Sequence, residues 1–227
     1  MAEPRQARPT ASATSLNPAA GHHAVTADPR ELAAAERAGD RSWATWRYYA
    51  RRYGDRGRQF TRSDSAWLAT LPGSPTAAVQ RQIRWLGSVL ASRGMPRLLL
   101  EDHLRLLHHE LVTAVPERAA EYGSLLDAAD TLRDERLAYM PEAVVEACER
   151  GFHELLESSV EDDLRAGALL AAAVADEQAG LSEAVTSLLD WLADPERFPG
   201  RWRLAVDQTL RLARDKATGP APTDAHS

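Results

Sequence analysis

The side chains best suited to metal or cofactor chemistry are three histidines, His103, His108 and His109, within one predicted helix. A metal site on a helix needs ligands three or four positions apart on one face. Leucines occupy those offsets from His103 and His108, and the Glu-x-x-His pattern of di-iron bundles occurs at none of the three. We therefore predict no metal site.

His103 borders the apolar stripe of its helix, which makes it the best candidate for a ligand to haem or a similar flat cofactor. His108, His109 and Trp85 complete the set of ligand or cofactor candidates. The alternative for His103 is a histidine at the edge of the core, bonded to a backbone carbonyl or to water. The sequence identifies no cofactor, and both interpretations stay open.

A basic cluster lies between residues 47 and 62, where Asp55 is the single acidic residue. It contains six arginines: Arg47, Arg51, Arg52, Arg56, Arg58 and Arg62. Such a cluster, interleaved with aromatic residues, fits an anionic ligand, nucleic acid or an acidic partner surface. No recognised nucleic-acid motif accompanies it. We therefore favour pairing of these arginines with the acidic second half of the chain, and we expect no nucleic-acid partner.

The net charge of −6 conceals an asymmetry along the chain, because residues 1–100 carry a balance of +8 and residues 101–227 one of −14. Such a split can create opposite potentials on two faces. We expect the two halves to neutralise each other within the fold or in a head-to-tail dimer. A homodimer and a complex with a protein partner both stay open.

Two further titratable residues lie on one predicted helix. His153 has Glu149 and Glu157 four positions away on either side, and neighbouring carboxylates favour a charged imidazole. His153 is therefore a pH-responsive candidate, although a surface network worth a few tenths of a kcal/mol is the alternative. Cys148 is the only cysteine and shares an apolar helix face, so we expect a small core residue rather than a nucleophile.

No catalytic arrangement is recognisable, so the sequence indicates no enzyme. The strand-turn-helix elbow of a nucleophile is absent, and Gly54 and Gly57 lack the strand and the third glycine of a dinucleotide loop. No apolar run approaches the roughly 20 residues of a membrane span, and the N-terminus lacks the apolar segment of a secretory signal. We expect a cytoplasmic protein without membrane contact.

The elements that position these residues are helices, and the clearest are two that meet at a corner. Ser74 and Pro75 supply a cap and a first residue. The first helix has a stripe at spacings of three and four, formed by Val79, Ile83, Leu86 and Leu90 and widened by Trp85 and Val89. Gly94 suits the left-handed turn that ends a helix. After Pro96 the same spacing recurs at Leu100, Leu104, Leu107 and Leu111.

Other helix starts are predicted at Asp28-Pro29-Arg30-Glu31, which has the pattern of a capping box, and at Pro116 and Pro141. The remaining boundaries follow from glycines and apolar spacing: a pause at Gly39-Asp40, an end at Gly54 and Gly57, and helices over Thr61–Leu71, Glu161–Ala179, from Ser182, and over Arg201–Arg214. No strand-length alternation occurs.

Composition and helix signals together predict the fold class. The chain of 227 residues is 44% hydrophobic and 26% charged, which is ordinary for a globular protein. We predict an all-α fold, a single bundle of about eight or nine helices over residues 28–215. Disordered tails are expected at residues 1–27 and 216–227, which lack an apolar period.

A family resemblance rests on three landmarks: Arg52-Tyr53-Gly54-Asp55-Arg56-Gly57-Arg58, then Trp85-Leu86, then Arg93-Gly94-Met95-Pro96. Over residues 45–135 the chain resembles the helical region that precedes the B12-binding module in some bacterial regulatory proteins. The Asp-x-His-x-x-Gly motif of such modules is absent from the sequence, as is a βαβ pattern. The resemblance therefore implies a helical sensory or interaction domain standing alone, without cobalamin binding.

Three function hypotheses follow. The first is a stand-alone sensory or interaction domain in bacterial regulation, which binds a protein partner or a small apolar ligand. The second is a haem- or metal-binding helical protein that uses His103. The third is anion or nucleic-acid binding through the Arg47–Arg62 cluster.

Overall fold

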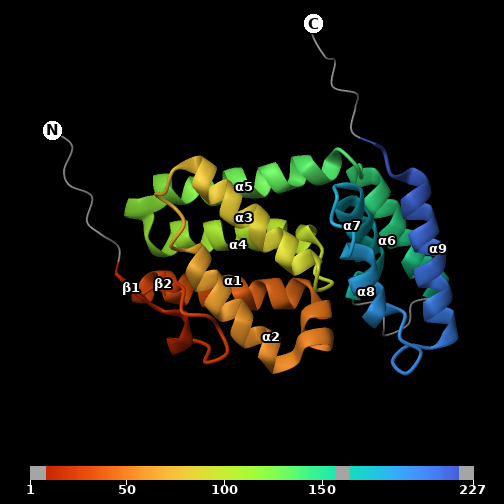
Figure 1. Cartoon of the computed structure of the whole chain (residues 1–227), viewed down its shortest axis with the longest axis horizontal. Helices are drawn as coiled ribbons and strands as arrows, with labels where there is room; N and C mark the ends of the chain where they lie inside the picture. Colours follow the sequence, from red (N-terminus) through yellow and green to blue (C-terminus); the bar gives the residue numbers. More distant parts are fainter. Residues whose placement is uncertain (1–8, 157–163, 220–227) are drawn as a thin grey trace, which may run out of the picture. The chain divides into compact units, whose positions relative to one another are not determined.

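The computed structural model describes residues 9–156 and 164–219, and over these residues the fold is all-α, as predicted. The helices are α1 Pro29–Thr45, α2 Arg47–Leu68, α3 Thr76–Ala91, α4 Arg97–Ala114, α5 Ala119–Leu137, α6 Glu142–Leu156, α7 Ala166–Gln178, α8 Ala184–Leu192 and α9 Gly200–Lys216 (Figure 1). Short elements precede α1 and α5: β1 Thr10–Ser12, η1 Ala13–Ser15, β2 Ala24–Thr26 and η2 Pro116–Arg118.

The described residues group into two compact units. Unit 1 comprises the chain up to Gln80 together with Asp102–Ala128, and unit 2 comprises Arg81–Glu101 and the chain from Ala129 onward. The division falls within α3, α4 and α5, so each of these helices contributes residues to both units.

The start of α1 follows the predicted pattern only in part. Asp28 caps the helix by accepting a hydrogen bond from the Arg30 amide at 2.8 Å, and Pro29 is the first helical residue. The predicted capping box is wrong, because the amide of Asp28 donates to the Thr26 hydroxyl. The Glu31 carboxylate is fully buried and instead accepts hydrogen bonds from Thr26, Arg118 and Tyr122.

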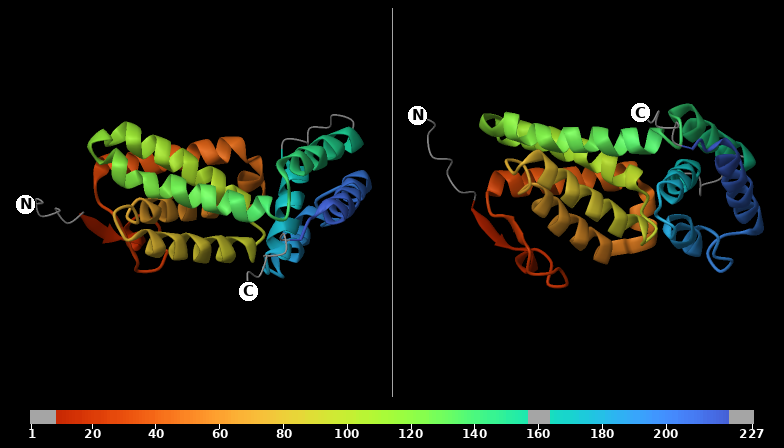
Figure 2. Two further views of the ribbon diagram at one scale, coloured as in Figure 1. Left: turned by 90° about the horizontal axis from the view of Figure 1, so that it is seen from above. Right: turned by 45° about the horizontal axis from the view of Figure 1, so that its top comes forward.

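Residues 9–27 are not the disordered tail that the sequence predicts. β1 and β2 pair antiparallel, with Ala11 opposite Val25, and they lie beside α2 in unit 1 (Figures 1 and 2). Ala13 and Val25 are completely buried and form a small cluster with Ala66 of α2. Strands of three residues show no readable alternation, so packing against α2 rather than local sequence defines this hairpin.

The boundaries of α1 and α2 also differ from the prediction. α1 runs through Gly39-Asp40 without a pause and ends at Thr45. The next residue, Trp46, caps the helix, and its indole N–H donates to Asp102 at 3.0 Å. The expected helix end at Gly54 is confirmed in part, because α2 consists of two helical segments joined by a kink at this residue. Gly54 makes a kink with φ 53° and ψ −152°, a conformation suited to glycine. Gly57 stays helical, and a Cβ at this position would lie 2.4 Å from the Cβ of Tyr53.

The stripe of α3 is confirmed in part. Val79, Ile83 and Leu86 are buried, Val89 and Leu90 are half-buried, and Trp85 is 59% exposed. Each helical residue advances about 100° around the axis, so Trp85 lies more than a quarter turn away from the stripe. Gly94 adopts the expected left-handed conformation with φ 79°, and the four predicted leucines of α4 are all buried.

Unit 2 has α7 as its central helix. α7 packs against α6, α8 and α9 (Figure 1), and its residues from Ala166 to Asp176 are all buried. Gly167 allows the closest approach, because a Cβ there would lie 2.4 Å from the Cys148 carbonyl oxygen of α6. The predicted start at Glu161 lies outside the described residues. Among those described, Arg165 precedes α7 in a left-handed conformation with φ 55°.

Candidate functional site

The candidate site is a groove in unit 1 between α1 and α2, with a volume of about 480 Å³. Its inner surface consists of Leu16, Ala35, Gly39, Trp43 and Thr61, and its rim consists of Glu36, Asp40, Asp55, Arg58, Gln59 and Arg62. The inner residues are buried or half-buried, and the rim residues are exposed. We call this feature the α1/α2 groove.

Trp43 is the largest apolar side chain that lines the α1/α2 groove, and it is buried. Its indole N–H donates to the Thr61 hydroxyl at 3.0 Å, and its ring stacks against Tyr49 with centroids 5.7 Å apart. Gly39 leaves space beside it, because a Cβ at this position would lie 3.2 Å from the Thr61 methyl carbon. The groove therefore has a fixed aromatic wall next to a glycine.

Two ion pairs join the helices at the groove rim. Arg58 pairs with Asp40, and Arg62 lies 4.0 Å from Glu36. The acids are four residues apart on α1 and the arginines four residues apart on α2, so the pairs follow each other along the antiparallel helices. All four side chains are more than half exposed. Exposed pairs of this kind contribute only about 0–1 kcal/mol, so either pair can be broken at low cost.

The guanidinium of Arg58 also lies over the Trp43 ring, 4.8 Å from its centroid. A cation over an aromatic face is attracted by the ring quadrupole. Asp55, in contrast, makes no hydrogen bond or ion pair through its side chain with any residue that the structure describes. It follows the Gly54 kink and is exposed. The groove rim therefore carries one carboxylate whose charge is not offset by a partner.

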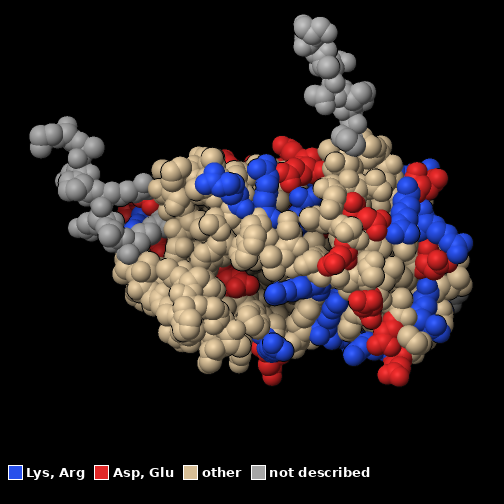
Figure 3. Space-filling view, viewed as in Figure 1, with Lys and Arg blue, Asp and Glu red and all other residues tan. Residues whose placement is uncertain are grey.

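The predicted arginine cluster is divided by the structure. Arg58 and Arg62 line the groove, and their described ion pairs are with α1, not with the second half of the chain. Arg52 donates to the Tyr48 hydroxyl, and Arg56 lies 6.0 Å from the Phe60 ring centroid. Arg47 and Arg51 are exposed. Basic side chains are visible over α2 in Figure 3. The cluster is therefore not one continuous anion site.

His103 lies in the core of unit 1 and does not line the α1/α2 groove. Its Nδ1 is 2.8 Å from the Ser42 hydroxyl of α1, and its Nε2 is 2.9 Å from the Ser65 hydroxyl of α2. Burial lowers the pKa of His103 to about 4, so the ring is neutral at pH 7. A haem or metal bound here would have to displace a serine. Coordination by His103 stays a hypothesis.

The other sequence candidates lie apart from the α1/α2 groove. His108 is half-buried, and burial together with the nearby His109 lowers its pKa. His109 is exposed on α4, as is Trp85 on α3. The described residues contain no group of three or more metal-ligating side chains that could hold an ion.

His153 and Cys148 both lie on α6. His153 is exposed, and its predicted partner Glu157 lies outside the described residues, so its pH response stays a prediction. Glu149, the other predicted partner, accepts a hydrogen bond from the Ala168 amide at the start of α7. Cys148 is fully buried, and burial raises the pKa of its thiol to about 11. A protonated, buried thiol fits the expected core role.

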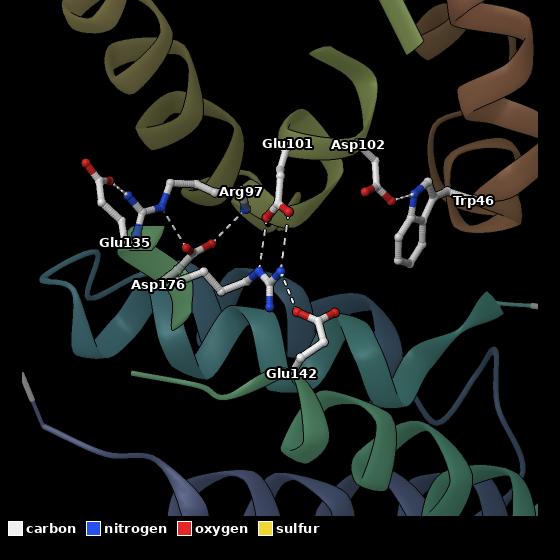
Figure 4. A network of polar contacts seen from close by, with 8 residues as sticks. Trp46, Arg97, Glu101, Asp102, Glu135, Glu142 and Asp176 are labelled. Carbon is white, nitrogen blue, oxygen red and sulfur yellow. Dashed lines mark hydrogen bonds and ion pairs between the residues drawn. The ribbon is translucent and has the colours of Figure 1, made fainter. Parts of the chain in front are cut away.

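Unit 2 contains a buried charge network that the sequence did not reveal. Arg97 donates to Asp176 through its backbone amide and its Nε, at 2.8 and 2.7 Å, and to Glu135 at 2.8 Å (Figure 4). A second guanidinium, that of Arg136, donates to Glu101 and Glu142. Burial raises the pKa of Asp176, although Arg97 opposes the shift. These contacts fix the start of α4 to α7 and are structural.

None of the described helices is both long and apolar enough to span a bilayer. Comparisons with protein-family models, with curated proteins and with solved structures find no match to this chain. The resemblance to the helical region that accompanies B12-binding modules therefore stays a hypothesis.

Proposed function

We propose that this protein is a helical ligand-binding domain that holds a small molecule in the α1/α2 groove. The observation that carries the proposal is the groove itself, because 480 Å³ lies within the usual range for small-molecule sites. Its composition fits the same role. Small-molecule sites combine apolar and aromatic walls with a few placed polar groups, and here Trp43 is surrounded by charged rim residues.

The rim suggests how a ligand would enter and be retained. The pairs of Arg58 with Asp40 and of Arg62 with Glu36 cross from α2 to α1 and are exposed. Because each is weak, a ligand can displace one of them and gain its charged partner in return. A sensory or interaction role in bacterial regulation, in the cytoplasm and with a protein partner, belongs to this proposal and rests on sequence features alone.

A melting-temperature screen against a small-molecule library tests the proposal. Ligands of the groove raise the melting temperature of the wild-type protein by mass action. Gln59→Trp places a large side chain on the exposed rim and is expected to remove these shifts. Gln82→Trp makes the same change at an exposed site on α3, outside the groove, and should preserve them.

Two results would count against the groove. A library that produces no shift in the wild-type protein removes the support for a small-molecule site. Shifts that persist in Gln59→Trp at the wild-type size would place the ligand elsewhere on the protein.

Anion or nucleic-acid binding is the second candidate function. It is favoured by Arg51 and Arg56, which are exposed and make no ion pair with the residues that the structure describes. It is disfavoured by the division of the cluster, because Arg58 and Arg62 pair with acids of α1.

A further inference from the structure

The charges around the α1/α2 groove are unequal. Its rim contains three carboxylates, on Glu36, Asp40 and Asp55, and two guanidinium groups. The arginines pair with Glu36 and Asp40, which leaves Asp55 without a partner among residues 9–156 and 164–219. The residues that line the groove therefore carry one excess negative charge next to an aromatic wall.

We propose that the ligand of the groove is an organic cation, an amine or guanidine attached to an apolar or aromatic body. This inference rests on the proposed function and specifies the chemistry of its ligand. The cationic group pairs with Asp55, and the body lies against Leu16, Ala35 and Trp43. Charge complementarity favours a positively charged ligand, because such a ligand gains the Asp55 carboxylate, with which no described residue forms an ion pair.

The position of Arg58 supports the same chemistry. Its guanidinium already occupies the Trp43 face at 4.8 Å, which shows that this indole is placed to receive a planar cation. Arg58 is exposed, and its pair with Asp40 is a surface pair. A planar ligand group can therefore replace Arg58 over the ring while the cationic group of the ligand pairs with Asp55. Arg58 therefore occupies the position over the Trp43 ring that we propose for the ligand.

An anionic ligand meets the opposite situation. To reach Arg58 or Arg62 it must release Asp40 or Glu36, and each released carboxylate then stands beside the new negative charge. Asp55 adds a third repulsive group on the same rim. Both arginines that line the groove are already paired with carboxylates. We therefore expect an anion to bind more weakly than a cation of the same size.

Three probes with one indole body test the sign of the charge: tryptamine, neutral tryptophol and indole-3-propionate. Calorimetric titration should give tryptamine an affinity about threefold to tenfold higher than that of tryptophol, with indole-3-propionate the weakest. Asp55→Asn should lower the tryptamine affinity to that of tryptophol and leave tryptophol unchanged. Asp190→Asn, the same substitution at an exposed site of α8, should change none of the three.

Arg58→Gln tests the same proposal through an expected gain, rather than a loss, of tryptamine affinity. It removes the internal cation from the Trp43 face and frees Asp40, so tryptamine should bind more tightly than to the wild-type protein. A general loss of groove structure would weaken all three probes instead, and the melting temperature of each variant detects such a loss. Tighter binding of tryptamine cannot result from unfolding.

The inference is overturned if tryptophol or indole-3-propionate binds as tightly as tryptamine, if Asp55→Asn has no effect, or if none of the probes binds. None of these results removes the proposed function, because the library screen with Gln59→Trp tests the groove without regard to ligand charge. Conversely, a negative screen would remove the groove as a ligand site for any charge class.

Discussion

The protonation of His103 follows from the hydrogen bonds of its two serine partners. The Ser65 hydroxyl donates its only hydrogen to the Thr61 carbonyl at 2.6 Å, so it must accept from His103. His103 therefore carries its proton on Nε2, and its bare Nδ1 accepts a hydrogen bond from the Ser42 hydroxyl. A metal would need the lone pair of Nδ1, and this lone pair already accepts the hydrogen bond from Ser42.

This assignment predicts a pH dependence of stability. Burial lowers the pKa of His103 from 6.5 to about 4. Between these two pH values the imidazole is protonated in the unfolded chain but stays neutral in the folded chain. Stability contributed by the neutral ring is complete above pH 6.5 and is lost as the pH falls toward 4, by roughly 3 kcal/mol.

Chemical denaturation of the wild-type protein and of His103→Gln between pH 4 and 7 measures this effect. The difference in unfolding free energy between the two should shrink toward acid pH, because glutamine does not titrate. Parallel stability curves would disprove the lowered pKa. Nitrogen-15 NMR of the ring should in addition show the Nε2–H tautomer at pH 7.

A second prediction at the residue scale concerns Arg97. Arg97→Met leaves the carboxylate of Asp176, which is 1% exposed, without its charge partner, and should cost about 3–5 kcal/mol of unfolding free energy. The double variant Arg97→Met/Asp176→Asn should recover most of this loss, because a neutral amide can still accept the hydrogen bond from the residue 97 backbone. Urea titrations of both variants give the comparison, and an unrecovered double variant would contradict the argument.

At the scale of the elements, two glycines in adjacent helices of unit 2 are expected to respond in opposite ways to the same change. Gly167→Ala puts a Cβ 2.4 Å from the Cys148 carbonyl oxygen of α6. Because this atom belongs to the backbone, one of the two helices must shift to relieve the clash. We expect a loss of about 1–3 kcal/mol or more in unfolding free energy.

Gly151→Ala is the matched control in α6, because nothing lies within 4 Å of its added Cβ. Alanine in place of glycine inside a helix stabilises by about 0.5–1 kcal/mol. Thermal unfolding of both variants tests the pair. Equal effects would mean that α6 and α7 approach less closely than the structure shows.

The helix starts that the sequence predicts best have a local chemical cause. Asp28 with Pro29, and Pro141, mark helices that begin within a residue of the expected place. Predictions failed where tertiary contacts determine the outcome. Gly57 was predicted to end the helix, but it stays helical within α2, whereas Gly54 does interrupt the helix with a non-helical backbone conformation.

The α1/α2 groove shows the same limit for a functional site. The arginine cluster directed attention to Arg58 and Arg62, but nothing local indicates that Trp43 lies beneath them. A signal was present in the matching four-residue spacing of acids on α1 and arginines on α2. Using it requires the knowledge that these helices are antiparallel neighbours, which only the fold supplies.

At the scale of the whole molecule, the charge asymmetry of the sequence is offset by ion pairs inside the units. Arg37 and Arg41 both pair with Glu110, and Arg97 pairs with Asp176. Each pair joins a basic residue of the first hundred to an acid of the second half. Over α9, basic and acidic side chains are intermixed (Figure 3). These pairs agree with the expectation that the halves neutralise each other within the fold.

This balance predicts weak affinity for nucleic acids. A net charge of −6 opposes approach to a polyanion, and Arg51 and Arg56 are too few for a strong electrostatic site. Gel-shift titrations with duplex DNA and single-stranded RNA should show no retardation at 150 mM salt, a condition chosen as about physiological. Binding that weakens steeply with salt, and is lost in Arg51→Gln/Arg56→Gln, would instead support the second candidate function.

The burial of Cys148 has a practical consequence for experiments on this protein. Because the only native cysteine is shielded and protonated, maleimide dyes should leave the wild-type protein unlabelled. A reporter can therefore be attached at one chosen position without first removing Cys148. Gln59→Cys would place a fluorophore on the groove rim, where its emission should report on ligand occupancy. Oxidising conditions should likewise not cross-link two copies of the folded chain.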